Sequence, residues 1–209
     1  MTQPSPALPA RFLTINKDYH FRPVESKDEE TLYRLVNEEA TRPYFMRPWL
    51  VTIDQERRFI KASNDGHQTQ LYAIVTAADA LVGVMGLHHI NQQSRTAETG
   101  AMLACTARNK GLGQAAKLVL LYHAFMVLNL RQITSRVIGY NTRSYEYSRK
   151  CGYTEVGRIK EHCYWDGSYH DEVTLLVTRQ SWQPHWERWC TATKRSTFQD
   201  MLMADGQLR

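Results

Sequence analysis

The stretch that decides the fold is CTARNKGLGQAAKLVLLYHAF, residues 105–125. It places Gly111 and Gly113 directly after a basic cluster and directly before an apolar run with helical spacing. Glycine leaves the backbone bare and permits positive φ angles, and the start of a helix offers unpaired N–H groups to negative charge. We therefore expect this stretch to bind an anion, and a phosphate group is the anion that the pattern favours.

The composition is that of one soluble domain. The 209 residues are enough to bury a core, and 43% of them are hydrophobic and 22% charged, as in an ordinary globular protein. The formal net charge of +5 favours an anionic ligand. No run of Lys and Arg resembles a basic arm, so we expect no nucleic-acid partner.

The cysteines and the N-terminal sequence bear on location. The four cysteines are far apart and form no C-x-x-C pair, which fits a reducing cytosol and suggests no metal site. MTQPSPALPA, residues 1–10, has neither the charged nor the apolar region of a signal peptide. No apolar run approaches about 18 residues. We therefore expect a cytoplasmic protein with no membrane segment and no bound metal.

Apolar spacing and turn residues predict a mixed order of strands and helices. The helix at 52–63 opens with a capping box, in which Gln55 follows Thr52 by three residues. The last two strands form a hairpin around DGS, residues 166–168, a favourable turn sequence. The predicted strands are 19–24, 70–77, 81–90, 96–105, 131–139, 155–165 and 169–179, and the predicted helices are 28–40, 52–63, one beginning at Gly113, and 141–152.

Three parts are expected along the chain. Residues 1–17, with three prolines among the first ten, predict a flexible N-terminal arm. Residues 18–182 are expected to form the domain, and residues 183–209 are expected to form a helical tail.

The tail and the residue before it carry a tryptophan stripe. Trp182, Trp186 and Trp189 recur at helical spacing and share one face. We expect this face to cover the chain's own domain, and the alternative is contact with a partner or with the second subunit of a homodimer.

Three phosphate-binding patterns compete for residues 105–125. A P-loop needs a Lys followed by Ser or Thr after its glycines, and neither pair is present there. A dinucleotide fingerprint belongs after the first strand of a parallel sheet, whereas GLGQAA, residues 111–116, follows antiparallel strands. The third pattern is RNKGLG, residues 108–113, which resembles the R/Q-x-x-G-x-G/A pyrophosphate loop of the GNAT acetyltransferases. A plain strand-to-helix turn is the remaining alternative.

The resemblance extends from Tyr19 to Trp182 with the segments in the right order. NTRSYEYSRKCGY, residues 141–153, resembles the N-x-x-S-x-x-x-x-x-K-x-G-F/Y segment of the RimJ/RimL-like branch. The final hairpin with its terminal Trp is similar to that branch, as are the central strands LVGVMGLHHI and TAETGAML. The chain is therefore identified as a member of the GNAT superfamily, in its RimJ/RimL-like branch.

The resemblance implies an α/β (α+β) fold, in which helices flank a mixed, mostly antiparallel sheet of about seven strands. Two neighbouring central strands, 96–105 and 131–138, would separate, and acetyl-CoA would lie between them as co-substrate. Asn141 has a second role open to it, as the N-cap of a helix. The implied cofactor contacts are Ala101, Met102 and Leu103 with the pantetheine arm, Arg108, Asn109, Lys110, Gly111, Leu112, Gly113 and Gln114 with the pyrophosphate, and Asn141 and Ser144 from the second side.

Acetyl transfer needs a base, because an ammonium ion has no lone pair. Glu98 lies about where several family members carry a catalytic glutamate, so it is the predicted base, and the alternative is a salt-bridged or solvent-edge residue. His88 and His89 are the second choice. Adjacent strand residues point to opposite faces, so only one of them can face the cleft and the two are a poor metal pair.

The acid for the leaving thiolate departs from the family pattern. Many members carry a tyrosine seven residues after the Asn, where this chain has Ser148. The leaving thiolate would then be assisted by Ser148 or by a water molecule, or it would leave unassisted. Asp171 and Glu172, at the mouth of the last hairpin, either recognise a cationic amine or are simply solvated.

The acceptor is expected to contact the loop TRPYFMRPWLV, residues 41–51, and the last hairpin. Aromatic residues with Arg42 and Arg47 suggest an acceptor with apolar surface and an acidic or phosphorylated group. The predicted function is direct acetyl transfer in a ternary complex, from acetyl-CoA to an N-terminal amine of a protein or peptide, or to a small amine such as an amino sugar. The alternative is a non-catalytic CoA-binding regulatory module of the same fold.

Overall fold

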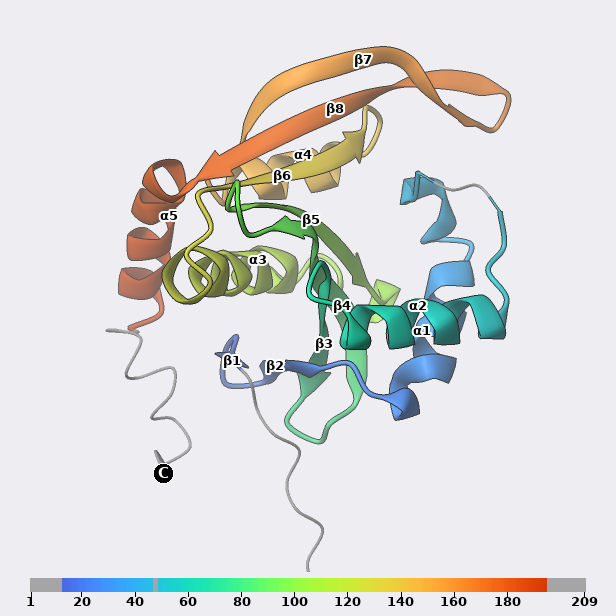
Figure 1. Cartoon of the computed structure of the whole chain (residues 1–209), viewed down its shortest axis with the longest axis horizontal. Helices are drawn as coiled ribbons and strands as arrows, with labels where there is room; N and C mark the ends of the chain where they lie inside the picture. Colours follow the sequence, from blue (N-terminus) through green and yellow to red (C-terminus); the bar gives the residue numbers. More distant parts are fainter. Residues whose placement is uncertain (1–12, 47–48, 195–209) are drawn as a thin grey trace, which may run out of the picture.

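A single twisted sheet organises the computed structural model, which describes residues 13–46 and 49–194 (Figure 1). Eight strands of the described chain pair in the order β1-β2-β3-β4-β5-β6-β8-β7, and only the β5–β6 pair is parallel. The strands are β1 Leu13–Thr14, β2 Tyr19–Pro23, β3 Gln70–Thr76, β4 Leu81–Asn91, β5 Thr96–Leu103, β6 Gln132–Ile138, β7 Thr154–Trp165 and β8 Ser168–Thr178. The predicted mixed, mostly antiparallel sheet is confirmed.

Helices cover both faces of the sheet, which buries two apolar clusters (Figure 1). Leu32 and Ile60 place α1 and α2 on one face, and the buried stretch from Ala115 to Tyr122 places α3 on the other. The longer helices are α1 Glu29–Asn37, α2 Ile53–Asp65, α3 Leu112–Tyr122, α4 Thr142–Arg149 and α5 Arg179–Ala192, and a π-helical turn, His123–Val127, follows α3. The capping box of Thr52 and Gln55 at the start of α2 is confirmed, with Gln55 N donating to Thr52 Oγ1 at 3.2 Å.

The N-terminal boundary of the domain lies earlier than predicted. Leu13 pairs with Phe21 across β1 and β2, and Leu13 and Ile15 are buried in the core. Residues 13–17 therefore belong to the domain, and the prediction of an arm over all of 1–17 is wrong for them. A two-residue strand has no alternation to detect, which explains why about seven strands were expected. Residues 1–12 lie outside the described chain.

The tryptophan stripe packs against its own domain. Helix α5 begins at Arg179, so the predicted boundary at residue 183 falls inside a single helix. The ring centroids of Trp182 and Trp186 lie 5.4 Å apart, and the Trp186 centroid lies 4.9 Å from that of Tyr122 in α3. Trp182 is buried, so the expectation that this face covers the domain is confirmed. Residues 195–209 of the predicted tail lie outside the described chain.

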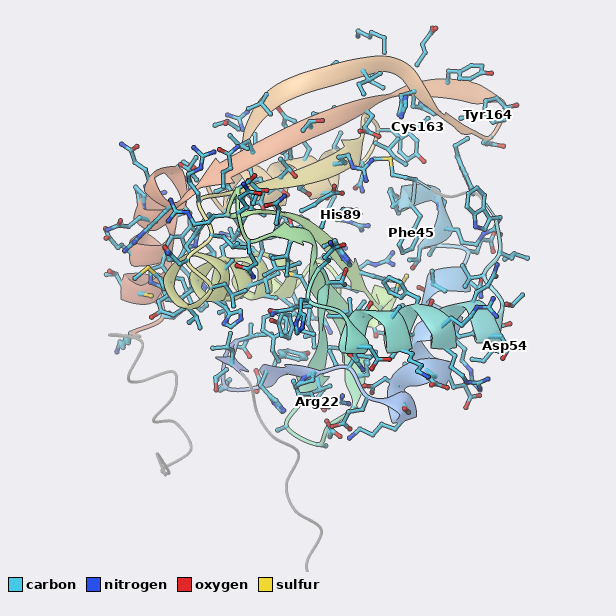
Figure 2. All side chains as sticks on the ribbon, in the orientation of Figure 1. Arg22, Phe45, Asp54, His89, Cys163 and Tyr164 are labelled. Carbon is cyan, nitrogen blue, oxygen red and sulfur yellow. The ribbon has the colours of Figure 1, made fainter. Side chains whose placement is uncertain are left out.

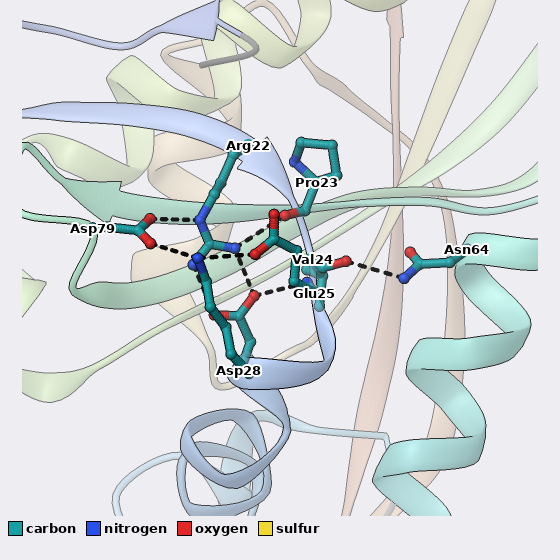
Figure 3. A network of polar contacts seen from close by, with 8 residues as sticks. Arg22, Pro23, Val24, Glu25, Asp28, Asn64 and Asp79 are labelled. Atoms are coloured by element: carbon teal, nitrogen blue, oxygen red, sulfur yellow. Dashed lines mark hydrogen bonds and ion pairs between the residues drawn. The ribbon is translucent and has the colours of Figure 1, made fainter. Parts of the chain in front are cut away.

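A buried ion cluster holds the first strands to the start of α1 (Figure 3). Arg22 of β2 donates through Nη1 and Nη2 to the carboxylate of Asp28, at 2.6 and 2.8 Å, and through Nε to Asp79 at 2.6 Å. Lys27 also donates to Asp79. The hydrogen bonds that Arg22 donates to Asp28 outweigh the cost of burial and raise the pKa of Arg22 well above its usual range. The cluster therefore stabilises the junction of β2, the turn before α1 and the β3–β4 turn.

Candidate active site

Strands β5 and β6 stay together for only three residue pairs. Residues 96–98 pair with residues 132–134, and beyond them the two strands continue without pairing. Ser135 Oγ still donates to Thr99 O at 3.4 Å, which marks the point of separation. We call this point, between Thr99 and Ser135, the fork. The predicted separation of two neighbouring central strands is confirmed, and residues 100–103 of β5 border the opening.

The loop before α3 presents bare backbone, as its glycines predict. Asn109 and Gly111 have φ angles of 61° and 75°, in the left-handed region. The N–H of Ala115 donates to Gly111 O at 3.1 Å, and within the described chain the N–H groups of residues 109–114 have no hydrogen-bond partner. A Cβ on Gly111 would meet no atom within 4 Å. Six unpaired donors at a helix start are suited to an anion with several oxygens.

Arg108 has a different role from the one its position in the loop suggests. Its Nε donates to Leu103 O at 2.8 Å, its Nη1 donates to Ala40 O at 2.9 Å, and its Nη2 donates to Thr41 Oγ1. Glu38 adds a carboxylate at 3.7 Å. The guanidinium is therefore turned away from the loop's N–H groups, and the prediction that it adds charge to a phosphate site is not supported. It ties this loop to the segment after α1.

Glu98 stands at the last pair before the fork. Glu98 and Met102 lie four residues apart on β5, so their side chains share one face of the sheet. Met102 packs with α1 and α2, which places Glu98 on that face. Arg136 Nε donates to Glu98 Oε1 at 3.0 Å, and Arg136 Nη1 lies 4.0 Å from Glu172 Oε2. The His162 imidazole lies 3.7 Å from the same Glu172 oxygen. Glu98 is therefore an ion-paired carboxylate at the fork, and about a quarter of its side chain is exposed.

The side chains of His88 and His89 on β4 point in different directions, as predicted. A bulge that follows His88 adds to the difference. His88 pairs directly with Glu98, and its Nε2 lies 3.0 Å from the Cβ position of Gly100. Phe59 of α2 stacks on His88 at a centroid distance of 6.4 Å. His89 is exposed in the bulge, with a φ of 51°. Only His88 shares the face and the strand position of Glu98.

The residues expected from the second side lie on α4. Asn141 is the N-cap, because its Oδ1 accepts from Ser144 N at 3.1 Å. Its proposed contact with the cofactor stays a prediction. Ser148 is fully buried, and its Oγ has no hydrogen-bond partner within the described chain. The full burial of this hydroxyl argues against Ser148 as the acid.

Asp171 and Glu172 lie within β8 and not at the mouth of the hairpin. Lys160 donates to Asp171 at 2.9 Å and Arg158 at 3.2 Å, and the Lys160 hydrogen bond, with further help from Arg158, lowers the pKa of Asp171 to about 2. Glu172 is buried opposite Ile138 of β6. Neither carboxylate is simply solvated, and both are already paired with cations.

The segment after α1 meets the tip of the β7–β8 hairpin, where Figure 2 places Cys163 and Tyr164. Cys163 Sγ lies 3.5 Å from Met46 Sδ, and the guanidinium of Arg42 lies 5.9 Å from the ring centroid of Trp165. Tyr140, which follows β6, donates its hydroxyl to Pro43 O. The two segments expected to contact an acceptor therefore touch each other. Arg47 lies outside the described residues.

The remaining features concern metal ligands, membrane-spanning helices and a cavity. Among residues 13–46 and 49–194, no three His, Cys, Asp or Glu side chains gather as metal ligands, and no helix is long and apolar enough to span a membrane. A cavity of about 340 Å³ lies between β6, α4 and the β7–β8 pair. It is lined by Val137, Ile138, Gly139, Thr142, Tyr145, Glu146, Arg158 and Val173.

Comparison with known proteins gives a family and close relatives. Residues 19–154 match the family model described as an acetyltransferase (GNAT) domain. The chain is 25% identical over 183 residues to the putative ribosomal N-acetyltransferase YdaF of Bacillus subtilis, covering 81% of this chain and 96% of that protein. It is 24% identical over 169 residues to the spermidine N(1)-acetyltransferase of Vibrio cholerae, covering 80% of this chain and 97% of the relative.

Solved structures share the fold. A crystal structure of the Vibrio cholerae spermidine N-acetyltransferase in complex with CoA and spermine superposes with a TM-score of 0.75 at 22% identity, covering 80% of this chain and 99% of that one. A second structure, of a probable acetyltransferase, gives a TM-score of 0.71 at 24% identity, covering 82% of this chain and 99% of that one. At these identities the likeness concerns the arrangement of strands and helices.

Proposed function

The chain belongs to the GNAT acetyltransferase family, and on that premise we propose that it transfers the acetyl group of acetyl-CoA directly to a primary amine, in a ternary complex. The observation that carries the proposal is the fork of β5 and β6, which opens beside a helix start with six unpaired N–H groups. A long ligand with a phosphate end and a reactive end suits this arrangement, because residues 100–103 of β5 lead from the fork to the loop before α3.

Different groups of residues fit different parts of acetyl-CoA. The N–H groups of residues 109–114 suit the pyrophosphate, and exposed Lys110 adds positive charge beside them. Backbone groups of Ala101 and Met102 border the opening and suit the amides of the pantetheine arm. The Leu103 carbonyl is already bound by Arg108, so we expect it to contribute less. When bound, acetyl-CoA supplies a thioester carbonyl that an amine can attack.

Glu98 is the proposed base. A protonated amine has no lone pair, so a carboxylate at the fork must accept one proton, directly or through a water molecule. The amine nitrogen then bonds to the thioester carbon and loses a second proton to water, the carbon–sulfur bond breaks, and its electron pair leaves on sulfur. Arg136 holds the Glu98 carboxylate in place from the neighbouring strand. His88, paired with Glu98 across β4 and β5, is the second choice.

The ion pairs that the carboxylates near the fork already form bear on the charge of the acceptor. Glu98 and Glu172 share Arg136, and Asp171 is held by Lys160 and Arg158, so the carboxylates around the fork are already matched by cations. A polyamine, which carries several ammonium groups, gains little from carboxylates that are already paired.

The cations on the acceptor side favour an acidic molecule. Arg42 lies over Trp165, and Arg143 lies 5.3 Å from the ring centroid of Tyr44. Such pairs bind apolar surface and carboxylates together. We therefore propose a single primary amine on a molecule with apolar and acidic surface, and a peptide N-terminus with acidic residues near it fits this description best.

The test is release of CoA from acetyl-CoA across a panel of amines. The panel holds a peptide with an acidic second residue, the same peptide with Lys in that position, a nucleotide-linked amino sugar and spermidine. We expect the acidic peptide to give the highest kcat/KM and Arg42→Gln to raise its KM several-fold. A preference for spermidine would contradict the acceptor proposal. CoA binding without turnover of any amine would favour the non-catalytic module.

A further inference from the structure

Lys117 is a fully buried cation that the proposed chemistry does not use. It lies on α3 with 1% of its surface exposed, and its Nζ donates to Thr99 Oγ1 at 3.0 Å. Thr99 Oγ1 also lies 2.8 Å from the hydroxyl of Tyr153. The ammonium lies 5.3 Å from the ring centroid of Tyr147 and 5.4 Å from that of Tyr153. Hydroxyls and aromatic faces therefore surround the charge.

No anion offsets this charge at neutral pH. Within the described chain, no carboxylate lies within 4.0 Å of Lys117 Nζ. The titratable groups that face it are Tyr147 on α4 and Cys151 and Tyr153 after α4. Burial raises the pKa of Cys151 to about 12 and that of Tyr153 to about 12, so the thiol and this phenol are neutral.

Lys117 itself remains protonated. Burial by itself lowers the pKa of Lys117, but contact with Tyr147 and then with Tyr153, whose ring faces attract a cation, raises it above the usual value. A buried cation without an anion is costly to a folded protein, because the lost hydration is not repaid. A cation kept in the core at this cost is suited to stabilise a negative charge that forms nearby.

The location of Lys117 indicates which negative charge that is. Thr99 is the residue at which β5 leaves β6, so the ammonium lies one hydrogen bond from the fork. Glu98 precedes Thr99 on β5 and faces the acceptor side, whereas Thr99 is buried on the α3 side. On the proposed function, Glu98 accepts the proton on the acceptor side, so the leaving sulfur belongs on the other side of the fork, where Thr99 lies. The charge that appears there during transfer is the thiolate.

We propose that Lys117 is a fixed positive charge beneath the fork that stabilises the CoA thiolate as it leaves. This inference rests on the proposed function. The carbon–sulfur bond breaks and its electron pair goes to sulfur. Of the two protons that the ammonium loses, one goes to Glu98 and the other to water, so no proton from Lys117 is needed for the transfer itself. The charge acts through Thr99 and across a short path of low dielectric, where one unit charge is felt strongly.

The proposal accounts for the missing acid. Ser148 occupies the position of the acid in the family pattern, but it is buried, and its hydroxyl has no hydrogen-bond partner among the described residues. A leaving group whose negative charge is stabilised by a nearby cation needs no proton at the moment of bond cleavage. Lys117 is accordingly a positioning charge, because it touches Thr99 and not the reacting atoms.

The direct test is the ionisation of the thiol of bound CoA. The thiolate absorbs in the ultraviolet, and the complex with desulfo-CoA is the blank that removes the protein's own tyrosines and cysteines. We expect the thiol pKa of bound CoA to lie below that of free CoA by about one unit or more. A bound thiol pKa equal to or above the free value would overturn the proposal. This titration uses the parent protein alone, so it does not depend on the folding of any variant.

Two variants locate the effect. Lys117→Met fills the same space without charge and is expected to return the thiol pKa to the free value and lower kcat about tenfold or more, while the acetyl-CoA Kd changes less than about threefold. Lys117→Arg retains the charge and should keep a lowered thiol pKa. A folded Lys117→Met protein whose bound thiol still has a lowered pKa would show that Lys117 serves stability alone.

The outcome is separable from that of the proposed function. A parent that binds CoA and transfers acetyl groups with an unshifted thiol pKa loses only this inference. A parent that does not bind CoA loses both.

Discussion

Glu98 and Arg136 lie on adjacent strands at the last pair before the fork, and Arg136 Nε donates to the Glu98 carboxylate at 3.0 Å. The same guanidinium reaches Glu172 at 4.0 Å, so one cation serves two carboxylates. Burial lowers the pKa of Arg136, but the Glu98 hydrogen bond and the charge of Glu172 outweigh it and raise the pKa overall. The orientation of the Glu98 carboxylate, the proposed base, is therefore set by Arg136, a residue that the sequence patterns did not single out.

The loop before α3 gives the first prediction. Gly111→Val should weaken acetyl-CoA binding at least about tenfold, because a branched side chain would occupy the space above the bare N–H groups and strain a left-handed residue. Gly167→Val is the matched control: Gly167 has a φ of 77° and equally open surroundings, but lies in the hairpin turn. Calorimetry should show normal affinity for the control, and equal affinity for both folded variants would refute the loop assignment.

Arg108 should affect the acceptor more than the cofactor. Arg108→Gln removes the hydrogen bonds to Ala40 and Thr41, which hold the segment leading to the acceptor loop. We expect the acceptor KM to rise several-fold and the acetyl-CoA Kd to change less than about threefold. Lys110→Gln, which neutralises the exposed cation of the same loop, should give the opposite pattern. Steady-state kinetics with calorimetry separates the two, and a larger loss of CoA affinity in Arg108→Gln would restore its predicted phosphate role.

The buried ion cluster of Figure 3 should dominate the stability of the N-terminal half. Arg22→Met leaves buried Asp28 without its cation and should lower the free energy of unfolding by about 3–5 kcal/mol. Arg34→Gln breaks an exposed pair with Glu30 and should cost less than about 0.5 kcal/mol. Denaturant unfolding measures both. Similar values for the two variants would mean that the cluster contributes no more than a surface pair.

A buried histidine should make stability depend on pH. Burial lowers the pKa of His123 from 6.5 to about 4, so the unfolded chain takes up a proton first as the pH falls. The stability that is present above pH 6.5 is therefore lost between about 6.5 and 4. Between pH 7 and 4.5 the parent should lose about 2 kcal/mol more than His123→Gln, which does not titrate. Parallel losses in the two proteins would exclude His123 as the source.

Much of the fold follows from local patterns. The long strands and the helices were predictable because their alternation and helical spacing extend over many residues, as in β3 and α3. The prediction that β5 and β6 are neighbours came from the family resemblance, since no local pattern encodes which strands pair; their parallel direction is a finding of the structure. Strand β1 was missed because two residues carry no periodicity.

Side-chain partners were harder to predict than backbone features. The bare loop follows from Gly111 and Gly113, but the direction of the Arg108 side chain depends in part on the Ala40 carbonyl and the Thr41 hydroxyl, which lie 68 and 67 residues earlier. Arg136 carries a signal in hindsight, as an exposed residue between buried Ser135 and Val137 on the strand beside Glu98. Lys117 also carries one, because a lysine within the buried stretch of α3 requires a polar partner.

Replacement of Glu98 by Gln tests the central claim most directly. Gln keeps the size and a hydrogen bond but cannot accept the proton of the amine, so kcat at pH 7 should fall at least about a hundredfold, with acetyl-CoA affinity nearly unchanged. The loss should shrink at high pH, where the amine deprotonates unaided. Glu172→Gln, which alters the other carboxylate beside Arg136, is the matched control and should lose far less kcat. A Glu98→Gln enzyme with near-normal kcat at pH 7 would contradict the account and direct attention to His88.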